Sequence, residues 1–161
     1  MTSSSKRLSV SAPISSEEEL LYDKDFFKWA KNQARFLKKQ EFSNLDIENL
    51  IEEIESLGRS ERRTLESYLE ILLMHMLKAK YQPTKHSKSW DLSIRNSRQK
   101  FKKVLRHNPS LRPKLAEILK DAYESARLDA ALETKLDEKI FPVDCPWTMN
   151  EILSEKMPSN K

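Results

Sequence analysis

The chain has 161 residues, of which 29 are Lys or Arg and 25 are Asp or Glu, and its formal net charge is +4. A single glycine, Gly58, excludes a fold rich in tight β-hairpin turns, and a charged fraction of 34% made largely of Lys, Glu and Arg favours helices. Cys145 stands alone and cannot form an intramolecular disulfide, and no apolar stretch suits a secretory leader or a membrane span, so we expect a cytoplasmic protein without membrane contact.

The two ends of the chain differ in composition from the middle. Residues 1–16 are rich in Ser, contain Pro13 and hold almost no large apolar side chain, which predicts a disordered tail. Residues 17–156 carry helical patterns, and residues 157–161 form a short C-terminal tail. We therefore expect one helical domain, at 17–156, between two tails.

The first helix is expected from near Asp23 or Asp25 to about Lys39, because acidic residues stand at its start and lysines at its end. Its apolar residues share one helical face and should be core, since two Phe and a Trp within one turn are most simply buried. The expected core face comprises Phe26, Trp29, Ala30, Gln33 and Leu37, with Phe27 and Ala34 beside it.

Residues 44–80 predict either one kinked helix or two segments. Ser43 and Asp46 have the spacing of a capping box, with Asp in place of the usual Glu or Gln. Gly58 is placed to end or bend the helix that follows, and Ser60 can cap a further segment. This arrangement favours two segments. The first of them should bury one side, made of Ile47, Leu50, Ile51, Ile54 and Leu57.

The stretch from Leu65 to Lys80 holds the densest run of large apolar side chains in the sequence. These residues repeat at the three-and-four spacing of a helix face, and further apolar residues widen that face until little of the helix is polar. A helix of this kind needs neighbours on most sides, so we expect it to be the central helix of a bundle. Its apolar residues include Leu65, Leu69, Leu72, Leu73, Met76 and Leu77.

Three more helices are expected after the break at Pro83. Ser87 or Ser89 should cap a fourth helix that runs to about His107, and Ser110 a fifth that runs to about Thr134. An ordered loop at 140–149 should hold Phe141, Val143 and Trp147 against the bundle, before a short helix at about 148–155. The fold class is therefore predicted to be all-α, a single-domain bundle of five to six helices.

Nine short strings stand out along the chain: Tyr22–Trp29, Asn49–Ile54, Leu57–Ser60, His75–Lys78, Tyr81–Pro83, Ser89–Trp90, Asn108–Leu111, Glu133–Thr134 and Phe141–Trp147. Taken together and in this order, they resemble a bacterial family catalogued as domain of unknown function 29. The resemblance covers about residues 20–156 and implies a helical bundle and a bacterial source, but it supplies no catalytic residue. Two departures from the family pattern are visible: His86 where an Arg is expected, and Lys135 where a Gly is expected.

The strongest electrostatic feature is the segment 78–114, which holds twelve basic residues against one acidic residue, Asp91. It could bind phosphates of a nucleic acid, or an acidic protein, and Tyr81 and Trp90 could stack on bases if they are exposed. The alternative is a solvated helix face whose charges are balanced by acidic neighbours in the bundle. The expected contact residues are Lys78, Lys80, Lys85, Lys88, Arg95, Arg98, Lys102 and Arg106.

Two weaker hypotheses concern a metal site and a nucleophilic cysteine. Glu52 and Glu53 with His75 could hold a divalent metal in a metal-assisted hydrolase or nuclease, although their spacing matches no metal motif. Cys145 could be a nucleophile only if a base or helix N-terminus lowered its pKa. The sequence thus predicts no catalytic residue and no cofactor. Its first function hypothesis is a non-enzymatic binding or regulatory module; a metal-assisted hydrolase and a purely structural interaction domain remain as alternatives.

Overall fold

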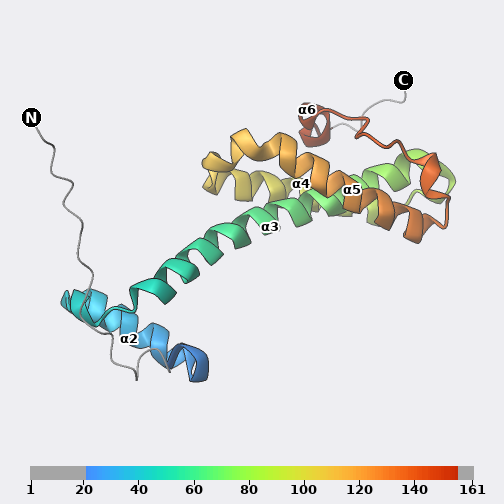
Figure 1. Ribbon diagram of the computed structural model, residues 1–161. Helices are drawn as coiled ribbons and strands as arrows, with labels where there is room; N and C mark the ends of the chain where they lie inside the picture. Colours follow the sequence, from blue (N-terminus) through green and yellow to red (C-terminus); the bar gives the residue numbers. More distant parts are fainter. Residues whose placement is uncertain (1–20, 156–161) are drawn as a thin grey trace, which may run out of the picture. The chain divides into compact units, whose positions relative to one another are not determined.

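The computed structural model describes residues 21–155, and within that range it is helical, without a strand (Figure 1). The prediction of an all-α fold is therefore confirmed. The two predicted tails, 1–16 and 157–161, lie outside the described residues. The chain divides into two compact units, one up to Leu57 and the other from Gly58. We describe each unit by itself.

The first unit consists of α2 (Phe26–Lys39), the short 3-10 helix η1 (Phe42–Asn44) and the first turns of α3 (Ile47–Tyr81). α2 begins close to the predicted start near Asp23 or Asp25, and Asp25 caps it, because its side chain accepts a hydrogen bond from the Lys28 backbone N–H. At the other end Gln40 adopts the left-handed conformation, with φ of 59°.

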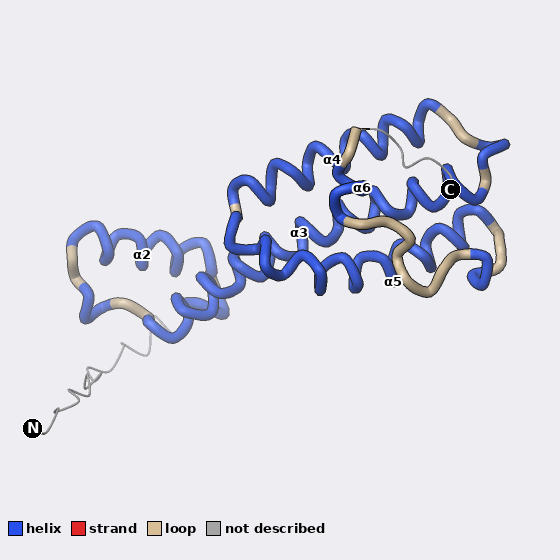
Figure 2. The backbone as a smooth tube through the Cα atoms, turned by 90° about the horizontal axis from the view of Figure 1, so that it is seen from above, coloured by secondary structure: helices blue, strands red, loops and turns tan. Residues whose placement is uncertain are grey.

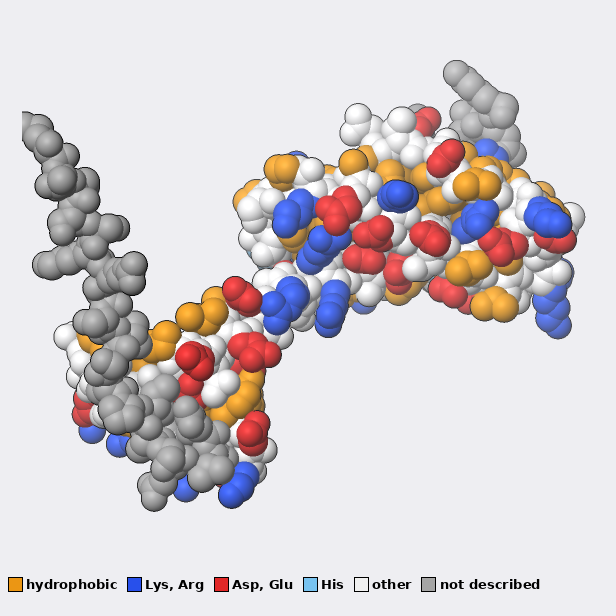
Figure 3. Space-filling model, in the orientation of Figure 1, with side chains coloured by type: hydrophobic (Ala, Val, Ile, Leu, Met, Phe, Trp, Pro, Cys, Tyr) orange, Lys and Arg blue, Asp and Glu red, His pale blue; other side chains and the backbone are white. Residues whose placement is uncertain are grey.

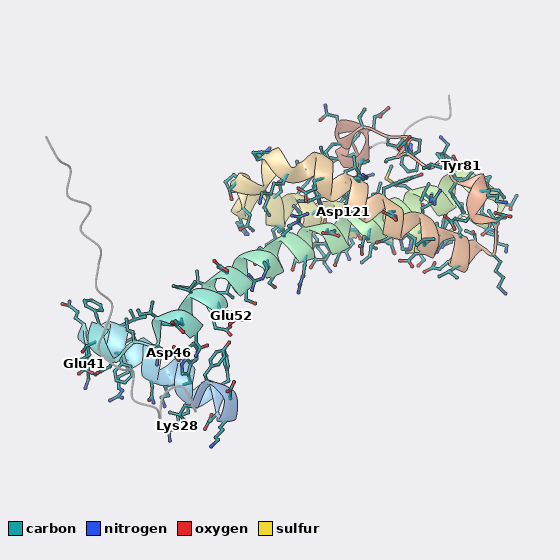
Figure 4. All side chains as sticks on the ribbon, in the orientation of Figure 1. Lys28, Glu41, Asp46, Glu52, Tyr81 and Asp121 are labelled. Atoms are coloured by element: carbon teal, nitrogen blue, oxygen red, sulfur yellow. The ribbon has the colours of Figure 1, made fainter. Side chains whose placement is uncertain are left out.

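A buried polar contact joins α2 to α3. The Trp29 indole donates to Asp46 Oδ2 at 3.0 Å, and the Asp46 backbone N–H donates to Gln33 Oε1 at 2.9 Å. Asp46 also accepts from the Asn49 N–H at 3.3 Å, so it caps α3 (Figure 4). The predicted cap at Ser43 was wrong, because Ser43 belongs to η1 and Asp46 takes the capping position.

Much of the predicted core of this unit is exposed. Trp29, Gln33 and Phe36 are buried, whereas Phe26 is 49% and Phe27 78% exposed. Along α3, Ile51 is 53% and Ile54 66% exposed. Helical spacing identified which apolar residues share a side of each helix. It could not show that α2 packs beside the apolar stripe of α3, on the side that carries Asp46 and Glu53, and not on the stripe itself.

The preference for two segments between 44 and 80 was also wrong. α3 is a single helix of 35 residues that passes through Gly58 and Ser60 without a break. Gly58 has ordinary helical geometry, and a Cβ built on it meets no atom within 4 Å. A lone glycine in a helix weakens it by only about 1 kcal/mol, which flanking residues can outweigh.

The second unit is built around the later part of α3, with α4 (Lys88–His107) and α5 (Leu115–Thr134) packed along it (Figures 1 and 2). The predicted central helix is confirmed: Leu65, Leu69, Leu72, Leu73 and Met76 are fully buried. Facing them are Ile94 and Phe101 of α4, the small residues of α5, and Phe141 and Trp147 of the loop after α5. Val143 was expected among them but is 80% exposed.

Short 3-10 segments link these helices: η2 (Pro83–Lys85), η3 (Pro109–Lys114) and η4 (Glu138–Ile140). Ser87 caps α4 as predicted. Ser110 lies inside η3, so the predicted cap of the fifth helix was wrong: α5 begins at Leu115 without a side-chain cap. The last helix, α6 (Met149–Leu153), opens with a capping box formed by Thr148 and Glu151.

Candidate anion-binding surface on α4

The inward face of α4 fixes where its cations lie. Ile94, Ser97, Phe101 and Leu105 are buried in the bundle, at the three-and-four spacing of one helical side. At 100° per residue, Lys88, Arg95, Lys102 and Arg106 lie within about 40° of one another on a flank of the helix outside that buried side, and all four are exposed. We call these four residues the α4 cation face.

The cations of this face are spaced regularly. Lys88, Arg95 and Lys102 follow one another at intervals of seven residues, which is about 10 Å along a helix, and Arg106 comes one turn later. Among the described residues none of the four forms an ion pair. The acidic residue of this helix, Asp91, is instead engaged by His86, whose Nε2 lies 2.7 Å from Asp91 Oδ1. The face therefore presents net positive charge to solvent.

A pocket of about 340 Å³ lies on one flank of this face. Its lining contains Arg95, Arg98, Gln99 and Lys102 of α4, together with Glu155 from beyond α6. Three cations, one amide and one carboxylate thus surround the same space, and the charge balance of the lining is positive. Planar guanidinium groups beside a lysine are well suited to hold an oxyanion such as a phosphate.

Arg98 is the most constrained member of the pocket. It is only 6% exposed, and its Nε donates to the Ile152 carbonyl at 2.9 Å. Its Nη2 is buried without a hydrogen-bond partner within the described part of the chain. Burial lowers the pKa of Arg98, although nearby Glu155 opposes that change. A buried guanidinium with an unused donor is costly unless something accepts from it, and an anion in the pocket could do so.

The remaining predicted contact residues lie in other surroundings. Lys78 is buried and paired with Glu133, and its Nζ stands 4.5 Å from the centre of the Trp90 ring. Lys80 lies over Tyr81 and Trp147, at 5.9 and 5.6 Å from the ring centres. Lys85 is exposed at the end of η2. The structure thus brings Arg95, Arg98 and Lys102 together, while Lys78 and Lys80 are engaged within the fold.

Base stacking by the two aromatic candidates finds no support. Trp90 is partly buried between Lys78 and the stacked ring of His86, 6.1 Å away centre to centre. Tyr81 packs edge-on against Phe141 at 5.2 Å, and burial raises the pKa of its hydroxyl. Both rings serve internal packing, so recognition on this surface would depend on charge.

The metal hypothesis also gains no support. Glu53 accepts a hydrogen bond from the Tyr22 hydroxyl at 2.6 Å, which raises the pKa of Tyr22 to about 12. His75 lies about six turns further along α3, where its Nδ1–H donates to the Ile71 carbonyl at 2.8 Å. Between residues 21 and 155 no group of three or more His, Cys, Asp or Glu side chains could hold a metal ion.

The surroundings of Cys145 do not activate its thiol as a nucleophile. Its thiol donates to the Trp147 carbonyl at 3.4 Å, and burial raises its pKa. A nucleophilic cysteine needs the opposite shift. It does line an open pocket of about 380 Å³ beside Tyr123 and Arg127, but Arg127 is paired with Glu138 there.

Sequence reasoning missed two members of the pocket on α4. Gln99 lies one turn from both Arg95 and Lys102, so helical spacing alone could have included it. Glu155 comes from the chain after α6, and no local pattern could have placed it beside α4.

These features define an all-helical protein with a cationic helix face. Among the described helices, none combines the length and the apolar character needed to cross a membrane. The family model described as "Domain of unknown function DUF29" matches residues 21–157, so the chain belongs to this family and the resemblance seen in the sequence is confirmed. A search of curated proteins found no match, and a search of solved structures found none either.

Proposed function

We propose that this protein is a non-enzymatic module that binds the phosphate backbone of nucleic acids through the α4 cation face. The observation that carries the proposal is the set of exposed cations on α4 that have no acidic partner among the described residues. The alternative, a face whose charges are balanced by acidic neighbours in the bundle, would show ion pairs at these residues. The pocket at Arg95, Arg98 and Lys102 would then hold one phosphate group.

Nucleic acid fits these observations better than an acidic protein does. Three of the cations follow one helix at regular intervals, and a nucleic-acid strand offers phosphates at regular intervals too. Because neither Trp90 nor Tyr81 is free to stack on bases, binding should depend on the backbone and vary little with sequence.

Fluorescence anisotropy with a labelled oligonucleotide of about 20 nucleotides, single-stranded or duplex, tests the proposal. We expect the double variant Arg95→Glu with Lys102→Glu to weaken binding at least about tenfold, because two phosphate contacts become repulsive. The matched control, Lys120→Glu with Lys139→Glu, changes the net charge equally at exposed positions outside the face and should bind almost as the unmodified chain does.

Two outcomes would overturn the proposal. One is the absence of any binding at low salt; the other is an equal loss of affinity in the two double variants, which would mean that only overall charge matters. If the unmodified chain instead bound a polyglutamate peptide more tightly than the oligonucleotide, the surface would be one for an acidic protein.

A further inference from the structure

The pocket on α4 is lined by hydrogen-bond donors from two turns of one helix. These residues leave the helix on neighbouring sides, within about 10 Å along its axis, and they are Arg95, Arg98, Gln99 and Lys102. Basic and acidic side chains lie intermixed on the surface of the second unit that Figure 3 shows. The pocket lining differs from that mixture, because its three cations share the space with one carboxylate, that of Glu155.

Arg98 supplies the fixed charge of this pocket. Its side chain leaves α4 between the buried side of the helix and the α4 cation face, and the Ile152 carbonyl of α6 holds its Nε. No carboxylate within the described part of the chain forms an ion pair with this buried guanidinium. A buried cation without a counter-ion is unfavourable, so an anion in the pocket would be stabilised by a charge that is already in place.

The net charge of the lining distinguishes two kinds of phosphate group. Three cations and one carboxylate leave the pocket with a net charge of +2. An internal phosphodiester of a nucleic acid carries one negative charge. A terminal phosphate monoester carries about −1.5 to −2 at pH 7 and has three acceptor oxygens, one more than the diester. The terminal group therefore comes closer to neutralising the pocket, and it offers more acceptors to the donors there.

The size of the pocket also suits the end of a strand. Its volume of about 340 Å³ lies near the lower limit of ligand-binding pockets, which is about 300 Å³. The lining comes from α4 and, at Glu155, from the chain after α6. An internal phosphate would have to bring a sugar into this space on each of its two sides, whereas a terminal phosphate brings only one.

We propose that the pocket on α4 binds the terminal phosphate monoester of a nucleic-acid strand. This assignment rests on the proposed function and makes it more specific, because the rest of the α4 cation face would contact internal phosphates of the same strand. Lys88 and Arg106 lie on that face outside the pocket, so the strand would continue from the pocket toward one of them.

Competition for a labelled oligonucleotide, followed by fluorescence anisotropy on the full chain, tests the proposal. The unlabelled competitors are single strands of about 10 nucleotides that share one sequence and have hydroxyl ends, a 5′-phosphate or a 3′-phosphate. A hydroxyl-ended strand about two nucleotides longer is the control, since it carries as much negative charge as a phosphorylated strand. We expect at least one terminal phosphate to improve affinity about tenfold over this control, through charge-assisted hydrogen bonds in the pocket.

Two double variants locate the preference for a terminal phosphate. Arg95→Gln with Lys102→Gln removes two pocket cations and should reduce the preference to within about twofold. Lys88→Gln with Arg106→Gln removes two cations outside the pocket, so it should weaken every competitor and leave the preference at about tenfold. All four positions are exposed, so neither variant should disturb the bundle.

The outcomes separate the terminal-phosphate site from the proposed function. If hydroxyl-ended strands bound as tightly as phosphorylated strands of equal charge, the site would be refuted and backbone binding would stand. A preference that survived Arg95→Gln with Lys102→Gln would also refute the site, because the strand end would then be held elsewhere. If inorganic phosphate displaced the label at the same concentration as a phosphorylated strand, the pocket would hold free phosphate and not a strand end. The absence of any binding would overturn both proposals.

Discussion

Lys135 shows how a single residue can oppose the backbone conformation at a helix end. α5 ends at Thr134, and Lys135 adopts the left-handed region with φ of 59°. A side chain with a Cβ is strained there, and glycine is not. The resemblance to the family had indicated a glycine at this position, and the geometry supplies the physical reason for it.

Lys135→Gly should therefore stabilise the protein. We expect the free energy of unfolding to rise by about 1 kcal/mol, because the strain disappears while the helix end keeps its conformation. Urea unfolding followed by circular dichroism measures the change. The control is Lys120→Gly, an exposed position within α5, which should lower the free energy of unfolding by about 1 kcal/mol. A loss of stability in Lys135→Gly would contradict the assignment of this helix end.

The second departure from the family pattern, His86, keeps the contacts that an arginine could make. Its ring stacks on Trp90 and engages Asp91 at the start of α4. Other residues of the strings that carried the resemblance also contact each other: Lys78 contacts Trp90 and Glu133, and Gln82 donates to the Thr134 carbonyl at 3.3 Å. Those residues hold the end of α3 against α4 and α5. Packing within the fold therefore accounts for their presence at these positions.

At the scale of elements, α3 is where sequence reasoning and structure differ most clearly. Gly58 and Ser60 look like a stop and a cap when read locally, yet the helix continues through both. The residues on either side are strong helix formers, and their summed preference outweighs one glycine. Local signals identify possible boundaries, but cooperativity along the helix decides which of them are used.

A pair of substitutions tests the continuity of α3. In a continuous helix, Gly58→Ala and Ser60→Ala should each raise the free energy of unfolding, by about 1 and 0.5 kcal/mol respectively, since a Cβ at 58 meets no neighbour. If Ser60 instead capped a separate helix, Ser60→Ala would lower it by about 1 kcal/mol. Urea unfolding of the two variants distinguishes these cases, and destabilisation by Ser60→Ala would contradict a continuous α3.

Burial could be predicted from the sequence where a helix has neighbours on several sides. In the second unit, apolar residues such as Leu69, Leu72 and Phe101 are buried because their helices have neighbours on several sides. In the first unit the same spacing, at Ile51 and Ile54, gives an exposed stripe. Periodicity defines which residues share a face, but only the tertiary arrangement, or a partner, decides whether that face is covered.

For the molecule as a whole, the concentration of basic residues in segment 78–114 leads to the candidate site. The sequence located the basic segment, and helical spacing separates its exposed cations from those used inside the fold. It could not show that Lys78 is paired with Glu133, or that Arg98 is buried against Ile152, because these partners lie far along the chain. The positive pocket on α4 is a tertiary feature of the same kind.

The salt dependence of oligonucleotide binding tests the central claim most directly. Each phosphate contact releases condensed counterions, so the slope of log affinity against log salt concentration counts the contacts, at about 0.9 per contact on duplex DNA. If the α4 cation face contacts phosphates, replacing Arg95 and Lys102 with Gln should make this slope shallower by about 2. An unchanged slope in that variant, or a flat one in the unmodified chain, would contradict the account.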